Sequence, residues 1–199
     1  GAFPTRTDYV SGPKTGCAVL GLIDGDGYPD LVSTSRDSSS VSVRLGTGTG
    51  TFGPKTDYKV GVWPLFAAVR DLNGDGFGDI VTANYNGYSF SVMLSNGAGG
   101  FLPRVDYAIG GSARGITFGY FNSDNNLDLA VTNQSQNRVN VFFGDGKGAF
   151  GSRIDLISGT QPAYVQAGDL NMDGKTDLVV SNFGASTLSV FFGNGNGTF

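Results

Sequence analysis

Two nine-residue segments of the sequence place acidic side chains, amides and glycine at a spacing that suits a hard cation. The segments 71–79 and 169–177 both match the pattern D-x-N-x-D-G-x-x-D. Oxygen atoms at positions 1, 3, 5 and 9, with the backbone carbonyl of position 7, can surround one Ca²⁺ ion, and glycine at position 6 permits the sharp turn. The alternative is a set of solvated turns, which Asp, Asn and Gly also favour. The expected calcium ligands are Asp71, Asn73, Asp75, Phe77 and Asp79, and Asp169, Asn171, Asp173, Lys175 and Asp177.

Two further segments carry a thinner version of the same pattern. Leu22 and Tyr120 stand where Asp71 stands in the complete pattern. Because affinity for Ca²⁺ depends on the number of charged ligands, we expect weaker binding there and two to four ions in all. The ligands expected in these segments are Asp24, Asp26, Tyr28 and Asp30, and Asn122, Asp124, Asn126 and Asp128.

These segments belong to a repeat that covers the chain. A Gly-x-Gly-x-Phe turn ends at Phe52, Phe101, Phe150 and Phe199, at a constant spacing of 49 residues. Repetition at such a period is typical of propellers and other repeat architectures. The repeat predicts one domain, residues 1–199, made of the units 4–52, 53–101, 102–150 and 151–199.

Each unit has the pattern of four strands. In the second unit, four short apolar stretches are bounded by Gly, Asn and Asp, as strands are; they are 65–70, 79–83, 90–95 and 103–109. In the first unit Val41 and Val43 alternate with Ser42, which predicts one buried face for the third strand. Four-stranded units that repeat radially indicate an all-β fold, a β-propeller of four four-stranded antiparallel blades.

The phase of the repeat predicts how the ring closes. The sequence starts on a fourth-strand segment, Phe3 to Val10, and stops just after a third strand, Leu188 to Phe192. We therefore expect the first strand to complete the last blade and close a four-bladed ring. The alternative is that the chain is part of a larger propeller of six to eight blades.

The cation pattern, the apolar strand after it and the segment Phe191-Phe192-Gly193-Asn194-Gly195-Asn196-Gly197-Thr198-Phe199 together resemble FG-GAP/VCBS repeats. That family includes the integrin α-subunit propeller and some fungal lectins. The resemblance implies a calcium-binding β-propeller whose ligands bind away from the calcium loops, often on the opposite face. It covers all four units of this chain.

The loops opposite the predicted calcium loops form a candidate ligand face. They join second to third strands, and fourth strands to the next unit, and they vary most between units. Exposed aromatic rings beside amides and arginine suit a sugar ring or a protein surface, although aromatic rings at these positions can also pack between blades. The candidate ligand-binding residues are Trp63, Tyr85, Tyr88, Arg36, Arg114, Arg138 and Phe183.

Composition narrows the function further. The net charge is −4 without a Lys/Arg-rich run, which argues against nucleic acid as a partner. No apolar stretch approaches the ~20 residues of a membrane-spanning helix, so we expect no membrane insertion. The absence of His removes Ser-His-Asp and His-ligated zinc chemistry.

We therefore expect a non-enzymatic, extracellular or cell-surface module that binds Ca²⁺ and a glycan or protein ligand. The alternative is a lyase-like enzyme acting on polysaccharide, or an accessory domain of one, because carboxylates alone can do acid–base work.

Overall fold

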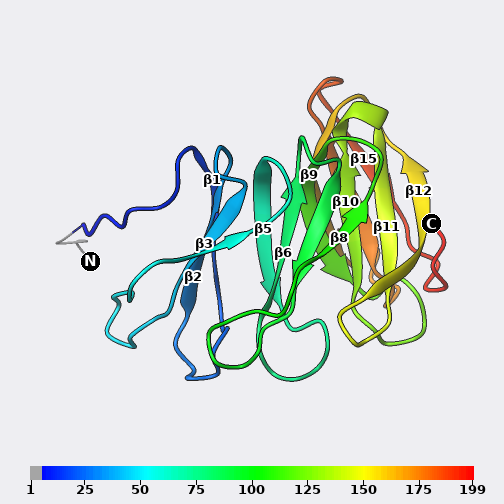
Figure 1. The fold of residues 1–199 in the computed structure, drawn as a ribbon. Coiled ribbons are helices and arrows are strands. Elements are labelled where there is room, and N and C mark those ends of the chain that lie inside the picture. Colours follow the sequence, from blue (N-terminus) through cyan, green and yellow to red (C-terminus); the bar gives the residue numbers. More distant parts are fainter. Residues whose placement is uncertain (1–5) are drawn as a thin grey trace.

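The computed structural model describes residues 6–199, which form fifteen strands in four antiparallel sheets (Figure 1). The first sheet contains β1 (Thr15–Gly21), β2 (Asp30–Ser35), β3 (Ser40–Arg44) and β4 (Thr56–Lys59). The second contains β5 (Pro64–Arg70), β6 (Asp79–Asn84), β7 (Ser89–Met93) and β8 (Val105–Ala108).

The third and fourth sheets follow the same plan. The third contains β9 (Ala113–Gly119), β10 (Asp128–Asn133), β11 (Arg138–Gly144) and β12 (Phe150–Ile157), with a single 3₁₀ turn, Gln134–Gln136, between β10 and β11. The fourth contains β13 (Pro162–Gly168), β14 (Asp177–Asn182) and β15 (Thr187–Phe191). Strands that follow each other in the chain pair within each sheet, so every sheet is a meander. The predicted strands of the second unit are confirmed to within two residues, and the all-β repeat architecture is confirmed with them.

The hydrophobic core lies between neighbouring sheets rather than at one centre. Side chains from the first and second sheets form one cluster, around Val41 and Ile80. A second cluster, around Phe90, joins the second and third sheets, and a third, around Val139, joins the third and fourth. Each of the two central sheets is therefore covered on both faces, as the blades of a propeller are.

This packing corrects the prediction of one buried face per third strand. All five residues of β7 are buried, including Ser89 and Ser91. The polar side chains are hydrogen-bonded there: the Ser91 hydroxyl donates to Asp106 at 2.5 Å, and in the first sheet Ser42 donates to Asp57 at 2.6 Å. The polar residues of the alternating pattern are therefore buried and hydrogen-bonded to the neighbouring strand, and they do not face water.

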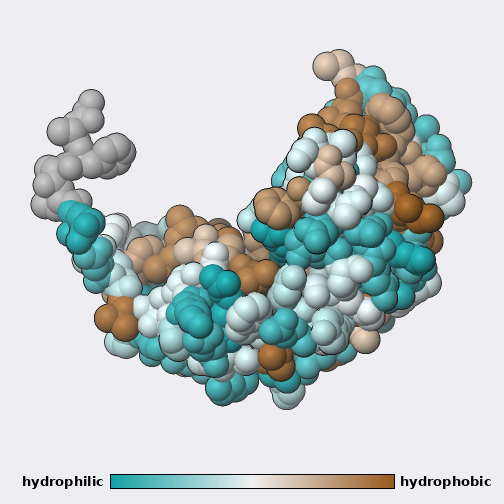
Figure 2. Space-filling model, turned by 90° about the horizontal axis from the view of Figure 1, so that it is seen from above, coloured by the Kyte–Doolittle hydropathy of each residue, from teal (hydrophilic) through white to brown (hydrophobic). Residues whose placement is uncertain are grey.

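The predicted closure of a four-bladed ring is not seen. The fourth sheet has three strands, and residues 6–14 form no strand; Phe3, Pro4 and Thr5 of the predicted segment lie outside the described residues. The sheets form an open crescent with the first and fourth sheets at its opposite tips (Figures 1 and 2).

The outer strands explain why the four sheets do not close. The Tyr58 ring packs edge-on against Phe101 of the next sheet at 4.9 Å, and Tyr107 does the same with Phe150 at 5.8 Å. A ring of four sheets needs a quarter turn between neighbours, which would pull these outer contacts apart. Within residues 6–199, no helix has the length and hydropathy to cross a membrane.

Phe90 tests this placement of the core. Its ring is fully buried and stacks on Tyr107 at 4.8 Å, with an edge contact to Phe142 at 4.9 Å. We expect Phe90→Ala to lower the free energy of unfolding by about 3–5 kcal/mol, measured by urea titration with circular dichroism. The control Ile157→Ala, at a side chain that is 78% exposed, should change it by about 0.5 kcal/mol or less. Equal losses in the two variants would contradict the core described above.

Candidate functional site

The four predicted calcium loops lie on one side of the molecule. Each joins the first strand of its sheet to the second, and the antiparallel order places the Gly-x-Gly-x-Phe turns, between third and fourth strands, on the same side (Figure 1). The loops that join second to third strands, such as the loop between β2 and β3, lie on the other side, and so do the connections from one sheet to the next. The sequence predicted this division, and the topology confirms it.

All four loops share the turn at positions 5 to 7. Position 6 adopts a left-handed conformation in each, with φ of 82° at Gly27, 87° at Gly76, 60° at Asn125 and 79° at Gly174. The backbone N–H of position 7 donates to the carboxylate of position 5 in every unit, at 2.7–2.9 Å; the pairs are Tyr28–Asp26, Phe77–Asp75, Asn126–Asp124 and Lys175–Asp173. The two incomplete loops therefore keep this turn. The third loop differs from the other three at position 4, where Ser123 is not left-handed.

The aspartate at position 9 is a buried clamp. Asp30, Asp79, Asp128 and Asp177 are all 0% exposed. One oxygen of each accepts the backbone N–H of position 2 at 2.7–2.9 Å. The other accepts, at 2.8–3.0 Å, the backbone N–H of the residue sixteen positions later, two residues before the Gly-x-Gly-x-Phe turn; these residues are Gly46, Ser95, Gly144 and Gly193. The sequence marked these aspartates as ligands only, and their structural role was missed.

Burial changes the protonation of this clamp. It raises the pKa of Asp79 to about 6, against the lowering effect of the hydrogen bonds from Leu72 and Ser95, and the charges of Asp75 and Asp71 raise it further. Burial raises the pKa of Asp30 and of Asp128 in the same way. A nearby cation would favour the ionised form of each carboxyl group.

Position 1 distinguishes the complete loops. The Asp71 carboxylate accepts the N–H of Gly74 at 2.7 Å and of Gly76 at 2.8 Å, and Asp169 accepts the N–H of Gly174 at 2.8 Å. In the other two loops this position is held by Leu22 and Tyr120, which are half exposed. Neither side chain has a carboxylate that could accept these N–H groups. The second and fourth loops therefore keep a carboxylate at position 1 and remain the better candidate cation sites.

The donor set fits Ca²⁺ chemically, because every side-chain donor is oxygen and a carboxylate that accepts one N–H keeps further lone pairs. Within residues 6–199, however, no three His, Cys, Asp or Glu side chains lie together as a ready-made metal centre. In the second loop the Asn73 amide donates to Asp75 at 2.9 Å. In the fourth, the Lys175 ammonium lies 3.6 Å from Asp173, and the Lys175 backbone N–H lowers the pKa of Asp173. Ion binding would require these side chains to reorient.

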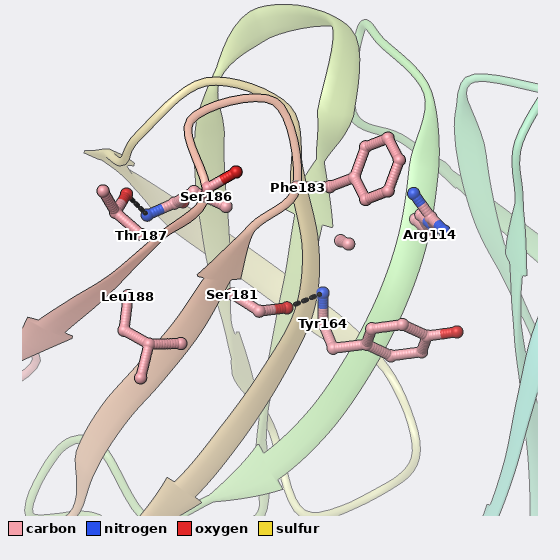
Figure 3. Close-up of a pocket in the computed structure, with 9 residues that line it drawn as sticks. Arg114, Tyr164, Ser181, Phe183, Ser186, Thr187 and Leu188 are labelled. Atoms are coloured by element: carbon pink, nitrogen blue, oxygen red, sulfur yellow. Dashed lines mark hydrogen bonds between the residues drawn. The ribbon is translucent and has the colours of Figure 1, made fainter.

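On the opposite side, the fourth sheet carries a pocket of 470 Å³ (Figure 3). The Arg114 guanidinium lies between two rings, 5.6 Å from the centroid of Tyr164 and 5.7 Å from that of Phe183. Ser181 and Leu188 line the wall facing away from the third sheet. The pocket therefore brings the Arg114 guanidinium and the rings of Tyr164 and Phe183 together at the edge of the outward face of the fourth sheet.

A second pocket of 350 Å³ adjoins the first and shares Arg114 and Tyr164 with it. Here Arg36 lies 5.8 Å from the Trp63 ring, and Trp63 lies 6.1 Å from Tyr85. Together the two pockets gather side chains from all four units on one face.

Five of the seven predicted ligand-binding residues line these pockets: Trp63, Tyr85, Arg36, Arg114 and Phe183. Tyr88 and Arg138 do not; Tyr88 is 54% exposed elsewhere, and Arg138 forms an ion pair with Asp155 at 3.2 Å. Tyr164 was missed because it lies inside a first strand, where the equivalent residues are Cys17, Phe66 and Gly115 and no loop signal exists.

The sequence profile of the FG-GAP-like repeat matches residues 23–82, 71–131 and 120–180. The chain belongs to the FG-GAP-like repeat family, as its resemblance indicated. No curated protein matches the chain in sequence.

Solved structures share the fold at low sequence identity. A lectin of Agrocybe aegerita that recognises non-reducing terminal N-acetylglucosamine is similar with a TM-score of 0.63 and 22% identity, over 90% of this chain and 49% of the lectin. BBS1N, from a complex with ARL6DN, gives 0.59 and 14%, over 90% of this chain and 54% of that one. The Vibrio cholerae biofilm matrix protein Bap1 gives 0.57 and 19%, over 90% and 27%. The chain thus spans about half the length of the first two structures.

The raised pKa of Asp79 predicts a pH dependence in the presence of chelator. The folded state holds this proton more tightly than the unfolded state, so the associated stability is complete below pH 3.8 and is lost as pH rises through about 6. Asp79→Asn should remove that downward slope from a plot of unfolding free energy against pH. Asp57→Asn is the control of opposite sign, because the hydrogen bond from Lys55 lowers the pKa of Asp57. If Asp79→Asn shows the same slope of unfolding free energy against pH as the wild type, the raised pKa of Asp79 is contradicted.

Proposed function

We propose that this chain is a calcium-binding, non-enzymatic binding module of the β-propeller type, whose ligand is a carbohydrate. The observation that carries the proposal is the division between its two faces. One face repeats an oxygen-rich loop four times, and the other gathers stacked arginine and aromatic side chains around two adjoining pockets.

The calcium role is structural. Asp71 and Asp75 lie within a few residues of each other on an exposed turn, and their negative charges repel in the absence of a counter-ion. Exposed sites of this kind suit the weak affinities of extracellular calcium modules, which supports an extracellular or cell-surface location. The second loop should bind more tightly than the fourth, because Lys175 already partly neutralises Asp173.

The carbohydrate role follows from the chemistry of the pockets. A sugar ring offers an apolar face for stacking and hydroxyl groups that require fixed polar partners. Tyr164 and Phe183 supply exposed rings, 56% and 70% accessible, and they hold the Arg114 guanidinium in a defined position between them. The similar Agrocybe aegerita structure is that of a sugar-recognising lectin, which makes N-acetylglucosamine a rational first probe.

Two observations favour binding over polysaccharide cleavage. The residues that line the two pockets include no Asp, Glu, His or Cys within the described part of the chain, so a carboxylate acid–base pair is missing there. The carboxylates of the opposite face recur in all four units and are tied to backbone N–H groups, whereas a catalytic pair should occur once.

Calcium should stabilise the fold. Each site that binds only the folded state contributes about 2.7 kcal/mol when free ion is a hundredfold above Kd. We expect the melting temperature to rise in Ca²⁺ and to fall in EGTA, and isothermal titration to show two sites that bind more strongly than any others. Asp71→Ala and Asp169→Ala should each remove one of these sites. The control Asp37→Ala, which lies outside the four candidate calcium loops, should remove none. A melting temperature unchanged by EGTA would sink the calcium proposal.

The ligand face is tested separately, on a glycan array and then by titration with N-acetylglucosamine. Phe183→Ala and Arg114→Ala should each weaken glycan binding at least tenfold, which is about 1.4 kcal/mol. Arg138→Ala removes an arginine that lines neither pocket and should leave binding intact. The proposal fails if no glycan binds the wild-type chain in saturating Ca²⁺.

A further inference from the structure

The outward face of the fourth sheet exposes residues that the other sheets bury. Leu188 is 70% exposed, Val190 47% and Leu170 49%. In the first three units the residues at these repeat positions are at most 5% exposed, because the next sheet covers them. The position of Leu188 is held by Val41, Phe90 and Val139, that of Val190 by Val43, Val92 and Val141, and that of Leu170 by Ile23, Leu72 and Phe121. The fourth sheet therefore has the surface of a sheet with a neighbour.

The outer edge of this sheet also lacks a repeated polar pair. A third-strand side chain donates to a fourth-strand aspartate in the other three sheets, at 2.5–2.6 Å; the pairs are Ser42–Asp57, Ser91–Asp106 and Asn140–Asp155. Ser189 on β15 holds the same position. Among residues 6–199 it has no such aspartate, since the fourth sheet ends at β15.

A matching strand segment lies at the other end of the crescent. Asp8 stands at the repeat position of Asp57, and Arg6 pairs with it at 2.8 Å as Lys55 pairs with Asp57 at 2.7 Å. The Tyr9 ring packs edge-on against Phe52 at 5.4 Å, and its hydroxyl accepts the Phe52 N–H at 3.2 Å.

The same contacts hold a true fourth strand between the second and third sheets. The hydroxyl of Tyr107, on β8, accepts the Phe150 N–H at 3.1 Å, and the two rings also meet edge-on. Residues 6–10 thus lie against the first sheet as the fourth strand of a preceding sheet would. Beside them the inner strand exposes Leu20, 59% accessible, where the equivalent Val69 is 5% accessible and packs on the preceding sheet.

Within residues 6–199 the two complementary surfaces lie at opposite tips of the crescent and do not meet (Figure 2). We propose that two copies of this chain join end to end, with residues 7–10 of each copy pairing antiparallel with β15 of the other. The register of β3 with β4 transfers directly: Ser40 with Lys59 and Ser42 with Asp57 become Thr187 with Val10 and Ser189 with Asp8 of the second copy.

Two crescents joined in this way form a ring with two identical junctions and twofold symmetry, which is the commonest symmetry of soluble oligomers. Each junction reproduces the sheet-to-sheet interface that the chain already contains three times. The Agrocybe aegerita lectin and BBS1N chains are about twice as long as this one, so a pair of copies contains as much chain as either.

Cross-linking tests the pairing directly. Opposite residues on antiparallel strands have Cα atoms about 4.5–5.5 Å apart, within the range of a disulfide. We expect Asp8→Cys/Ser189→Cys, in a Cys17→Ala background, to give a covalent dimer on non-reducing gels after oxidation. The single variants, Asp8→Cys and Ser189→Cys, should form the dimer only when mixed, through one disulfide. A cross-link within one chain, which would give a compact monomer, or no cross-link would overturn the proposal.

The mass in solution gives a second test that needs no engineered thiol. Light scattering across a dilution series of the wild-type chain should show a dimer that dissociates to monomer. Leu188→Glu should raise the dissociation constant at least tenfold. Ile157→Glu is the control, because its repeat position is exposed even where a neighbouring sheet is present, at Lys59 and Ala108. A wild-type chain that stays monomeric at all concentrations, or a Leu188→Glu chain that dimerises as well as the wild type, would refute the dimer.

Discussion

The buried aspartate at position 9 of each loop is the interaction on which the rest of the molecule depends. Its two oxygens connect the turn that leaves the first strand to the turn that leaves the third, and in doing so they satisfy two backbone N–H groups that water cannot reach. An unpaired buried donor costs about 1–3 kcal/mol, so each clamp is a substantial fraction of a small domain's stability. Asp30 and Asp128 keep this role in units where Leu22 and Tyr120 stand at the first position of the loop. The clamp therefore does not depend on a carboxylate at that position.

The two faces of the molecule differ in their side chains more than in their backbone ties. On one side, the aspartate clamp recurs in all four units although the loops diverge at the first position. On the other side, a backbone N–H donates in every unit to the carbonyl of the residue 22 positions earlier, at 2.9–3.3 Å; the donors are Arg36, Tyr85, Gln134 and Phe183. The side chains at this one repeat position are as different as those names indicate. A backbone that is fixed on both sides can therefore present varied side chains on one of them, which is the arrangement expected of a scaffold that presents binding residues.

The fold was largely readable from the sequence, because a 49-residue period reports directly on repeated units and the strand boundaries follow from Gly, Asn and Asp. The number of sheets that close a ring was not readable. It depends on the angle between neighbouring sheets, which is set by contacts such as Tyr58 on Phe101 that no local pattern encodes. The candidate calcium positions came from spacing alone, whereas the clamp did not, because Ser95 and Gly193 are distant in sequence and take part through their backbone. Tyr164 was invisible for a related reason: its place depends on Gly115 of the neighbouring sheet, where a Cβ would lie only 2.9 Å from the Tyr164 Cα, so the two strands approach this closely only at a glycine.

The position of Arg114 has a mechanical consequence. The residue belongs to the third sheet, while the two rings that hold it, Tyr164 and Phe183, belong to the fourth. The pocket therefore lies across the boundary between the third and fourth sheets, and its width depends on the angle between these two sheets. A molecule seated in it would act as a brace that stiffens this boundary, and a tilt transmitted from elsewhere in the crescent would open or narrow the pocket without moving any residue within either sheet.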